Sequence, residues 1–98
     1  MQQYVFKVHP NNKHADGIII GNAPSLAKAK IILLSLTNKD IFPHDNYKRS
    51  ELFFNTRNFK IQETLDLQDD SDTDCWYIIN VCTTTQKEGF IAGCYHAG

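Results

Sequence analysis

The alternation of apolar and polar positions predicts that the chain begins with two strands. Residues 3–8 place aromatic and β-branched side chains on one face with a period of two. Turn-forming residues dominate 9–17, and the three isoleucines of 18–20 indicate a short strand that is buried on both faces. We therefore expect the two strands to pair as a hairpin with a long loop. Three side chains share one face of the first strand: Tyr4, Phe6 and Val8.

A helical period appears in residues 25–37. Ser25 or Asn22 can accept hydrogen bonds from the first amides of this helix, and Asn38 can adopt the left-handed conformation that ends one. One apolar stripe follows the helical spacing and consists of Leu26, Ala29, Leu33 and Leu36. Further apolar residues widen this stripe, so we expect the C-terminal half of the helix to be covered on several sides; they are Ile31, Ile32 and Leu34.

Four later segments are rich in aromatic, β-branched and threonine residues and are predicted to be strands: 51–55, 58–67, 75–85 and 90–96. The order along the chain is then β-β-α-β-β-β-β. This order favours a two-layer α+β fold, in which an antiparallel sheet of about five to six strands carries the helix on one face. No repeat or low-complexity linker divides the chain, so we expect residues 1–98 to form a single domain.

The last two predicted strands have the strongest pairing signal. Residues 87–89 fit a three-residue hairpin loop with glycine at its end. In the register that this loop sets, Cys82 faces Cys94. Both faces of the hairpin are largely apolar, so we expect either a sheet that is covered on both sides or an apolar face that meets a partner. A homodimer is one form of the second arrangement.

Composition and hydropathy limit the class of protein. Hydrophobic residues make up 42% of the chain and charged residues 21%, as in ordinary globular proteins. The longest apolar run, Ile31 to Leu34, is far shorter than the roughly 20 residues of a membrane span, and the first residues show no secretory signal. Three cysteines are an odd number at modest density. We therefore expect a soluble cytoplasmic protein without membrane association.

Charge divides the chain into two parts, although the formal net charge is only −1. Residues 1–60 carry nine Lys or Arg against four acidic residues, and residues 61–98 carry one Lys against seven. Four aspartates lie together in a predicted loop: Asp69, Asp70, Asp72 and Asp74. They resemble the start of a calcium-binding loop, but Cys75 replaces its glycine and Val81 its bidentate glutamate. A solvated loop is the simplest interpretation; an acidic surface for a basic partner and a weak cation site are the alternatives.

The cysteine and histidine pattern gives little support to a reaction centre. Cys82, Cys94 and His96 share one face in the predicted register, but a zinc site needs about four ligands. A disulfide between the two cysteines and a cysteine nucleophile beside His96 are further alternatives. Packing of small thiols within the sheet is the simplest interpretation. We therefore predict no catalytic residue, no metal site and no cofactor.

The segment 47–60 interleaves aromatic and basic side chains, a combination typical of proteins that bind single-stranded nucleic acid. Its basic residues are Lys48, Arg49, Arg57 and Lys60. No RNA-recognition motif accompanies them, and the loop 21–25 before the helix lacks a phosphate-binding motif. Nucleic-acid binding is therefore the alternative function, and a solvated basic rim is the simpler explanation.

Together these patterns predict a small interaction protein without catalysis. The expected partner is a larger protein or nucleoprotein complex, bound through an acidic and aromatic surface. The biological form that we expect from size and charge is an inhibitor from a virus or mobile element, which blocks a host nuclease or nucleic-acid-handling complex. The predicted partner-binding residues are Asp69, Asp70, Asp72, Asp74 and Trp76.

Overall fold

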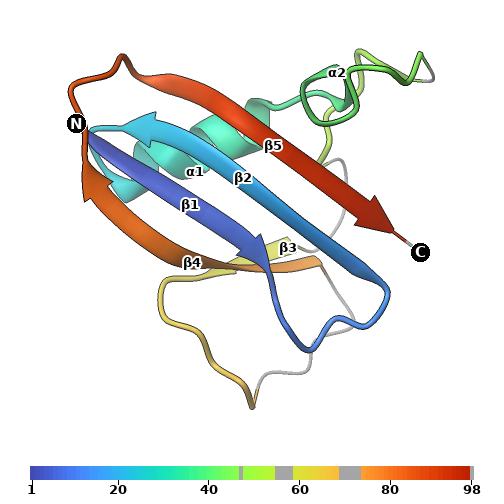
Figure 1. Cartoon of the computed structure of the whole chain (residues 1–98), viewed down its shortest axis with the longest axis horizontal. Coiled ribbons are helices and arrows are strands. Elements are labelled where there is room, and N and C mark those ends of the chain that lie inside the picture. The colour runs from blue at the N-terminus through green and yellow to red at the C-terminus, as the bar shows by residue number, and fades with distance from the viewer. Residues whose placement is uncertain (47, 55–58, 69–73, 98) are drawn as a thin grey trace.

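A β-sheet with helices on one side makes up the computed structural model of the chain (Figure 1). The structure describes residues 1–46, 48–54, 59–68 and 74–97. The elements in chain order are β1 (Gln2–Val8), β2 (Ala15–Ala23), α1 (Leu26–Ser35), α2 (Asn38–Ile41), β3 (Phe59–Gln62), β4 (Asp74–Thr83) and β5 (Gly89–Ala97). This arrangement confirms the predicted α+β class.

The strands follow the order β3-β4-β1-β2-β5 across the sheet. Neighbouring strands are antiparallel except β3 and β4, which are parallel. The sheet is therefore mixed, and the prediction of a purely antiparallel sheet is wrong. The predicted strand 51–55 is also wrong in its described part, because Leu52 forms only an isolated bridge to Thr37. The predicted strand 58–67 is shortened to β3.

The hairpin of β1 and β2 lies at the centre of the sheet and confirms the predicted pairing. Its antiparallel register places Val5 opposite Ile20 and Phe6 opposite Ile19. Phe6 and Ile19 are buried beneath the helices, whereas Val5 and Ile20 are half-buried on the other side. The prediction that the isoleucine strand is buried on both faces is therefore wrong.

The last two strands do not form the hairpin that the sequence predicts. β4 pairs with β1 and β5 pairs with β2, so the whole first hairpin lies between them. Cys82 consequently lies opposite Gln3, and Cys94 lies opposite Ile18. Consecutive strands are neighbours in only about two-thirds of cases. Here residues 84–88 instead pass across the end of the central hairpin, from β4 beside β1 to β5 beside β2 (Figure 1).

The crossing segment 84–88 is held by a buried asparagine of the central hairpin. Asn22 Nδ2 donates a hydrogen bond to the Lys87 carbonyl at 3.1 Å and another to Gln86 Oε1 at 3.3 Å. Asn22 has no exposed surface, and a buried amide is costly to leave without partners. Gly89, which begins β5, has a positive φ of 138°. Gly89 thus has the positive φ that the predicted hairpin turn requires, but it ends the segment that crosses from β4 to β5.

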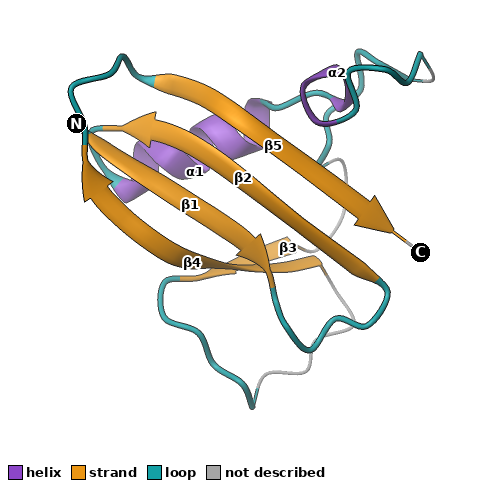
Figure 2. Ribbon diagram, viewed as in Figure 1, coloured by secondary structure: helices purple, strands orange, loops and turns teal. Residues whose placement is uncertain are grey.

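α1 begins at the predicted cap and buries two residues of its predicted stripe, but it ends at Ser35, and Asn38 begins α2 instead of ending α1 in a left-handed conformation. Ser25 is the N-cap, and its Oγ accepts a hydrogen bond from the Lys28 amide at 3.3 Å. Ala29 and Leu33 are buried between α1 and the sheet, which lies in front of the helix in Figure 2. Neither α1 nor the other described helix has the length and apolar character needed to cross a membrane.

α2 covers the outer strand β5 from the same side of the sheet. The Thr37 amide donates to Asp40 Oδ2 at 2.8 Å, which forms the capping box of this short helix. Ile41 packs over Gly93, where an added Cβ would lie 3.1 Å from Ile41 Cδ1. The sequence predicts a loop for residues 39–50 because turn-forming residues dominate it, and only its beginning is helical.

Candidate functional site

The structure describes two of the five predicted partner-binding residues. Asp69, Asp70 and Asp72 lie outside the described residues, and so does the acidic loop that could hold a cation. Asp74 begins β4, where its backbone lies opposite Phe59 of β3. Trp76 follows in the same strand and is only 1% exposed.

The burial of Trp76 follows from its position on the helix side of the sheet, opposite Val8. The centroid of its ring lies 5.6 Å from that of Phe54 and 6.3 Å from that of Tyr95. Gly17 leaves room for the indole, because a Cβ at this position would lie 3.0 Å from Trp76 Cη2. The prediction that Trp76 anchors a partner at the surface is therefore wrong: the ring belongs to the core.

The basic residues proposed for nucleic-acid binding are engaged locally and lie in separate places. Arg49 Nη1 donates to the Pro43 carbonyl at 3.3 Å and to Asn46 Oδ1 at 3.0 Å, within the turn after α2. Lys48 occupies the same turn, whereas Lys60 lies on β3 at a different part of the molecule (Figure 1). Arg57 lies outside the described residues. The described members of this set do not form one binding surface.

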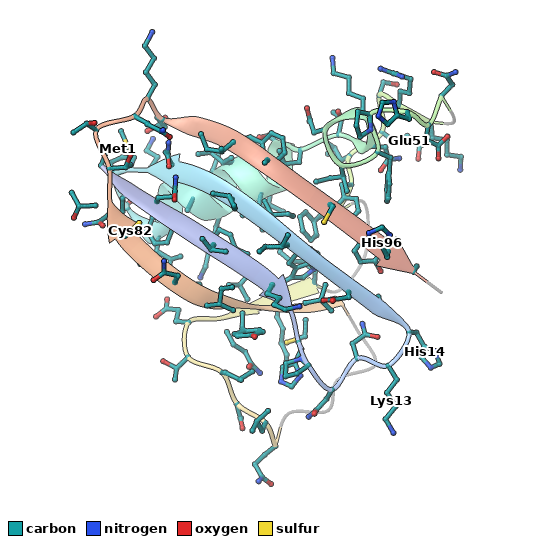
Figure 3. The ribbon with its side chains drawn as sticks, viewed as in Figure 1. Met1, Lys13, His14, Glu51, Cys82 and His96 are labelled. Carbon is teal, nitrogen blue, oxygen red and sulfur yellow. The ribbon has the colours of Figure 1, made fainter. Side chains whose placement is uncertain are left out.

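The cysteines and His96 also lie apart. Cys75 is buried, whereas Cys82 and Cys94 are exposed and form no disulfide. The predicted facing of Cys82 and Cys94 is wrong because two strands separate them. Figure 3 shows Cys82 and His96 at opposite ends of the sheet, which removes the proposed nucleophile pair. In the parts of the chain that the structure describes, no three His, Cys, Asp or Glu side chains gather to hold a metal ion.

The side of the sheet opposite the helices carries an apolar surface, which we call the open face. Directly opposed residues of an antiparallel ladder point to the same face. The register places Asn80, Val5, Ile20 and Ala92 in one row, and Tyr77, Lys7, Ile18 and Cys94 in the next. Among the apolar members, Val5, Ile18 and Ile20 are half-buried, whereas Ala92 and Cys94 are exposed. No described segment lies in front of this face in Figure 2.

An ion pair borders the apolar centre of the open face. Lys7 Nζ lies 2.5 Å from Asp16 Oδ1 on the neighbouring strand. The hydrogen bond from Lys7, followed by that from the Gly17 amide, holds the pKa of the Asp16 carboxyl below its ordinary value. His96 lies directly opposite Asp16 on β5 and makes a smaller contribution in the same direction. The open face therefore combines an apolar centre with a balanced pair of charges.

A shallow depression of about 440 Å³ lies between the loop of the central hairpin and the end of β5. Its charged and imidazole-bearing lining residues are Lys7, His9, Lys13, His14, Asp16 and His96. His9 is buried and serves the fold: its Nε2 donates to the Asp66 carbonyl at 2.8 Å, and its Nδ1 accepts from the Asn11 amide at 3.1 Å. Lys13 and His14 point away from the sheet in Figure 3, so these groups do not converge on one ligand position. The sequence gives no signal for this depression, because only the strand order brings its two parts together.

The outer side of α1 carries a second apolar surface, which we call the helical ridge: Ala27, Ile31 and Leu34. Ile31 is 58% exposed and Leu34 46% exposed. Their spacing places them on the side of the helix opposite the buried Ala29 and Leu33. The prediction that the C-terminal half of α1 is covered on several sides is wrong for the described residues, which leave Ile31 and Leu34 exposed.

The two apolar surfaces point in opposite directions, one from the helix layer and one from the sheet. The sequence pattern identifies Ile31 and Leu34 as apolar positions of the helix but not their exposure. The open face is not identified, because it depends on the strand order and on the position of α1. No protein-family model matches the chain, and no curated protein or solved structure matches it.

Proposed function

We propose that this chain is a small, non-catalytic protein-interaction module, which inserts the helical ridge of α1 into an apolar groove on a larger protein. The observation that carries the proposal is the exposure of Ile31 and Leu34 on a helix that is apolar on both sides. Large apolar side chains that stay exposed together on a helix are typical of a surface that binds another molecule. The described residues leave Ile31 and Leu34 uncovered, and in this proposal another molecule covers them.

The shape of the ridge favours a groove as its binding site. Ala27, Ile31 and Leu34 follow the i, i+4, i+7 spacing by which helices dock into hydrophobic grooves. The small Ala27 lets the partner approach the helix backbone, while the two larger side chains act as anchors. Removal of their remaining exposed surface from water contributes roughly 1–2 kcal/mol for each anchor.

The ion pair beside the ridge gives it a polar border. Lys30 Nζ lies 3.9 Å from Glu63 Oε1, and both side chains are largely exposed. Apolar anchors within a polar rim are the usual anatomy of a protein interface. In the inhibitor form predicted from the sequence, the aspartates of the acidic loop add a second contact, to a basic site on the same partner.

The test begins with capture of the partner from the native cells. A photo-crosslinking amino acid at position 31 is expected to capture a specific protein, and the same group at position 91 is expected not to capture it. Ile91 is a suitable control because it lies on β5 and is 46% exposed.

The captured protein then allows a measurement of affinity. Leu34→Lys is expected to weaken binding by about tenfold to a hundredfold, because it removes an anchor and places a charge in an apolar groove. Val81→Lys, at an equally exposed position (46% for both side chains), is expected to change the dissociation constant by less than about twofold. Equal losses in both folded variants, or no capture from position 31, would contradict the proposal.

A further inference from the structure

We propose that a second copy of this chain covers the open face, so that two molecules pack sheet against sheet in a twofold-symmetric dimer. This inference concerns a different surface from the helical ridge and does not depend on the proposed function. Stable folds cover the apolar face of a sheet with a further layer. The described residues provide such a layer only on the helix side of this sheet.

The dimensions of the molecule suit a layered dimer. The chain is a slab that measures 36 by 36 by 19 Å, and its short axis accommodates one sheet and one helix layer. Sheets that pack face to face lie about 10 Å apart and interleave their side chains. Two copies would therefore form four layers, with the helices outside and the two sheets at the centre.

The area of the open face is sufficient for a specific dimer. Strands β4, β1, β2 and β5 lie side by side, and with about 4.8 Å between strands and about 3.4 Å per residue they cover roughly 450 Å² for seven residues. Two copies together then bury roughly 900 Å² in projection, and more when the relief of the side chains is counted, which is close to the roughly 1,000 Å² that a specific interface requires. The helical ridge, with two large side chains, is too narrow for this.

The charge pattern of the open face favours a copy of itself as the partner. A twofold dimer places identical patches against each other, so any net charge in the patch repels its copy. Lys7 lies within this face, directly opposite Ile18, and its positive charge is balanced by the carboxylate of Asp16, with which it is paired. This pair adds no net charge that would repel the same face of a second copy.

The side chains of the centre also suit close packing of two sheets. Val5, Ile18 and Ile20 are β-branched and stand out from the sheet, whereas Ala92 and Cys94 are small. The large side chains lie on β1 and β2 and the small ones on the neighbouring β5. This separation allows two copies to interdigitate, because the larger residues of one molecule fill the space above the smaller residues of the other.

Sedimentation equilibrium over a wide range of protein concentration tests the proposal. The unmodified chain is expected to change from one-chain to two-chain mass as its concentration rises. Val5→Lys is expected to raise the dimer dissociation constant by at least about a hundredfold, because two charges would be buried in each dimer. Leu34→Lys, which alters the helical ridge, is expected to leave this constant within about twofold.

A second, milder variant tests the same face in case Val5→Lys does not fold. Ile20→Thr keeps the β-branched shape that suits a strand, and it is expected to weaken the dimer by about tenfold while circular dichroism shows an unchanged fold. A chain that stays monomeric at every concentration overturns the proposal. A dimer that survives in Ile20→Thr and folded Val5→Lys but is lost in Leu34→Lys also overturns it, because the second copy would then lie on α1.

Discussion

The two faces of the central hairpin use neighbouring residues in opposite ways. Phe6 and Ile19 face the helices and are fully buried, whereas Val5 and Ile20, one position along each strand, lie half-buried on the open face. Hydropathy does not cause the difference, since Ile19 and Ile20 are the same residue type. The cause is the side of the sheet on which α1 lies. Apolar periodicity thus identifies positions that need a cover, but not whether the chain itself supplies it.

The largest expected effect compares these neighbours directly. Phe6→Ala removes a ring from the covered face and is expected to lower the free energy of unfolding by about 3–5 kcal/mol. Val5→Ala removes two methyl groups from the open face and is expected to cost less than about 1.5 kcal/mol in the monomer. Urea denaturation of dilute protein measures both values. Equal losses would contradict the distinction between the two faces.

A second comparison tests how tightly the covered face is filled. Gly17→Ala is expected to destabilise the chain by about 2–3 kcal/mol, because the new Cβ would lie 2.9 Å from the Cys94 carbonyl oxygen and 3.0 Å from the Trp76 ring. Gly21→Ala, on the same strand, meets its nearest atom only at 3.6 Å and is expected to change stability by less than about 0.5 kcal/mol. Thermal unfolding of the pair is the measurement. Tolerance of Ala at position 17 would show that Trp76 is not packed there.

The crossing segment that separates β4 from β5 gives a smaller effect. Asn22→Ala removes the hydrogen bonds to Gln86 and Lys87 and is expected to cost about 1–2 kcal/mol. Asn80→Ala makes the same chemical change at an exposed position of β4 and is expected to cost less than about 0.5 kcal/mol. Hydrogen exchange should also show faster opening of residues 84–88 in Asn22→Ala. Equal losses of stability and equal exchange rates in the two variants would show that Asn22 does not hold the crossing segment.

The smallest effect concerns the ion pair at the border of the open face. Because the folded-state pKa of Asp16 lies below its ordinary value of 3.8, the stabilisation by its carboxylate is present above that value and is lost as the pH falls through the lower folded-state pKa. Lys7→Met is expected to raise the pKa of Asp16 towards the ordinary value. An NMR titration of the side-chain carboxyl measures the shift, and Lys28→Met on α1 is the control. An unchanged pKa in Lys7→Met would show that Lys7 is not its main cause.

Local patterns were sufficient to predict the first hairpin and α1. Alternation over a whole strand identifies the buried Tyr4 and Phe6, and a cap residue such as Ser25 marks the start of a helix through hydrogen bonds within one turn. Each of these features depends on residues that are close in sequence. The same patterns identified Ile31 and Leu34 of the helical ridge as apolar positions, although not their exposure.

The strand order could not be predicted in this way. Residues 87–89 fit a hairpin turn, and the competing arrangement depends on contacts between distant residues such as Asn22 and Lys87. When both faces of two strands are largely apolar, their sequences do not indicate which strands they pair with. Because β4 and β5 are not neighbours, the prediction that Cys82 faces Cys94 is wrong as well. The burial of Trp76 likewise depends on the distant Gly17, which leaves space for its ring.

The most direct test of the central claim, that one face of the sheet is covered by the chain and the other by a second molecule, uses two native thiols. Cys75 is buried in the fold, and Cys94 is exposed on the open face. Their alkylation rates can be followed by peptide mass spectrometry in dilute and concentrated protein. We expect Cys75 to react slowly at every concentration, and Cys94 to react rapidly in dilute protein and slowly in concentrated protein. A Cys94 that reacts equally fast at all concentrations, or as slowly as Cys75 in dilute protein, would contradict the account.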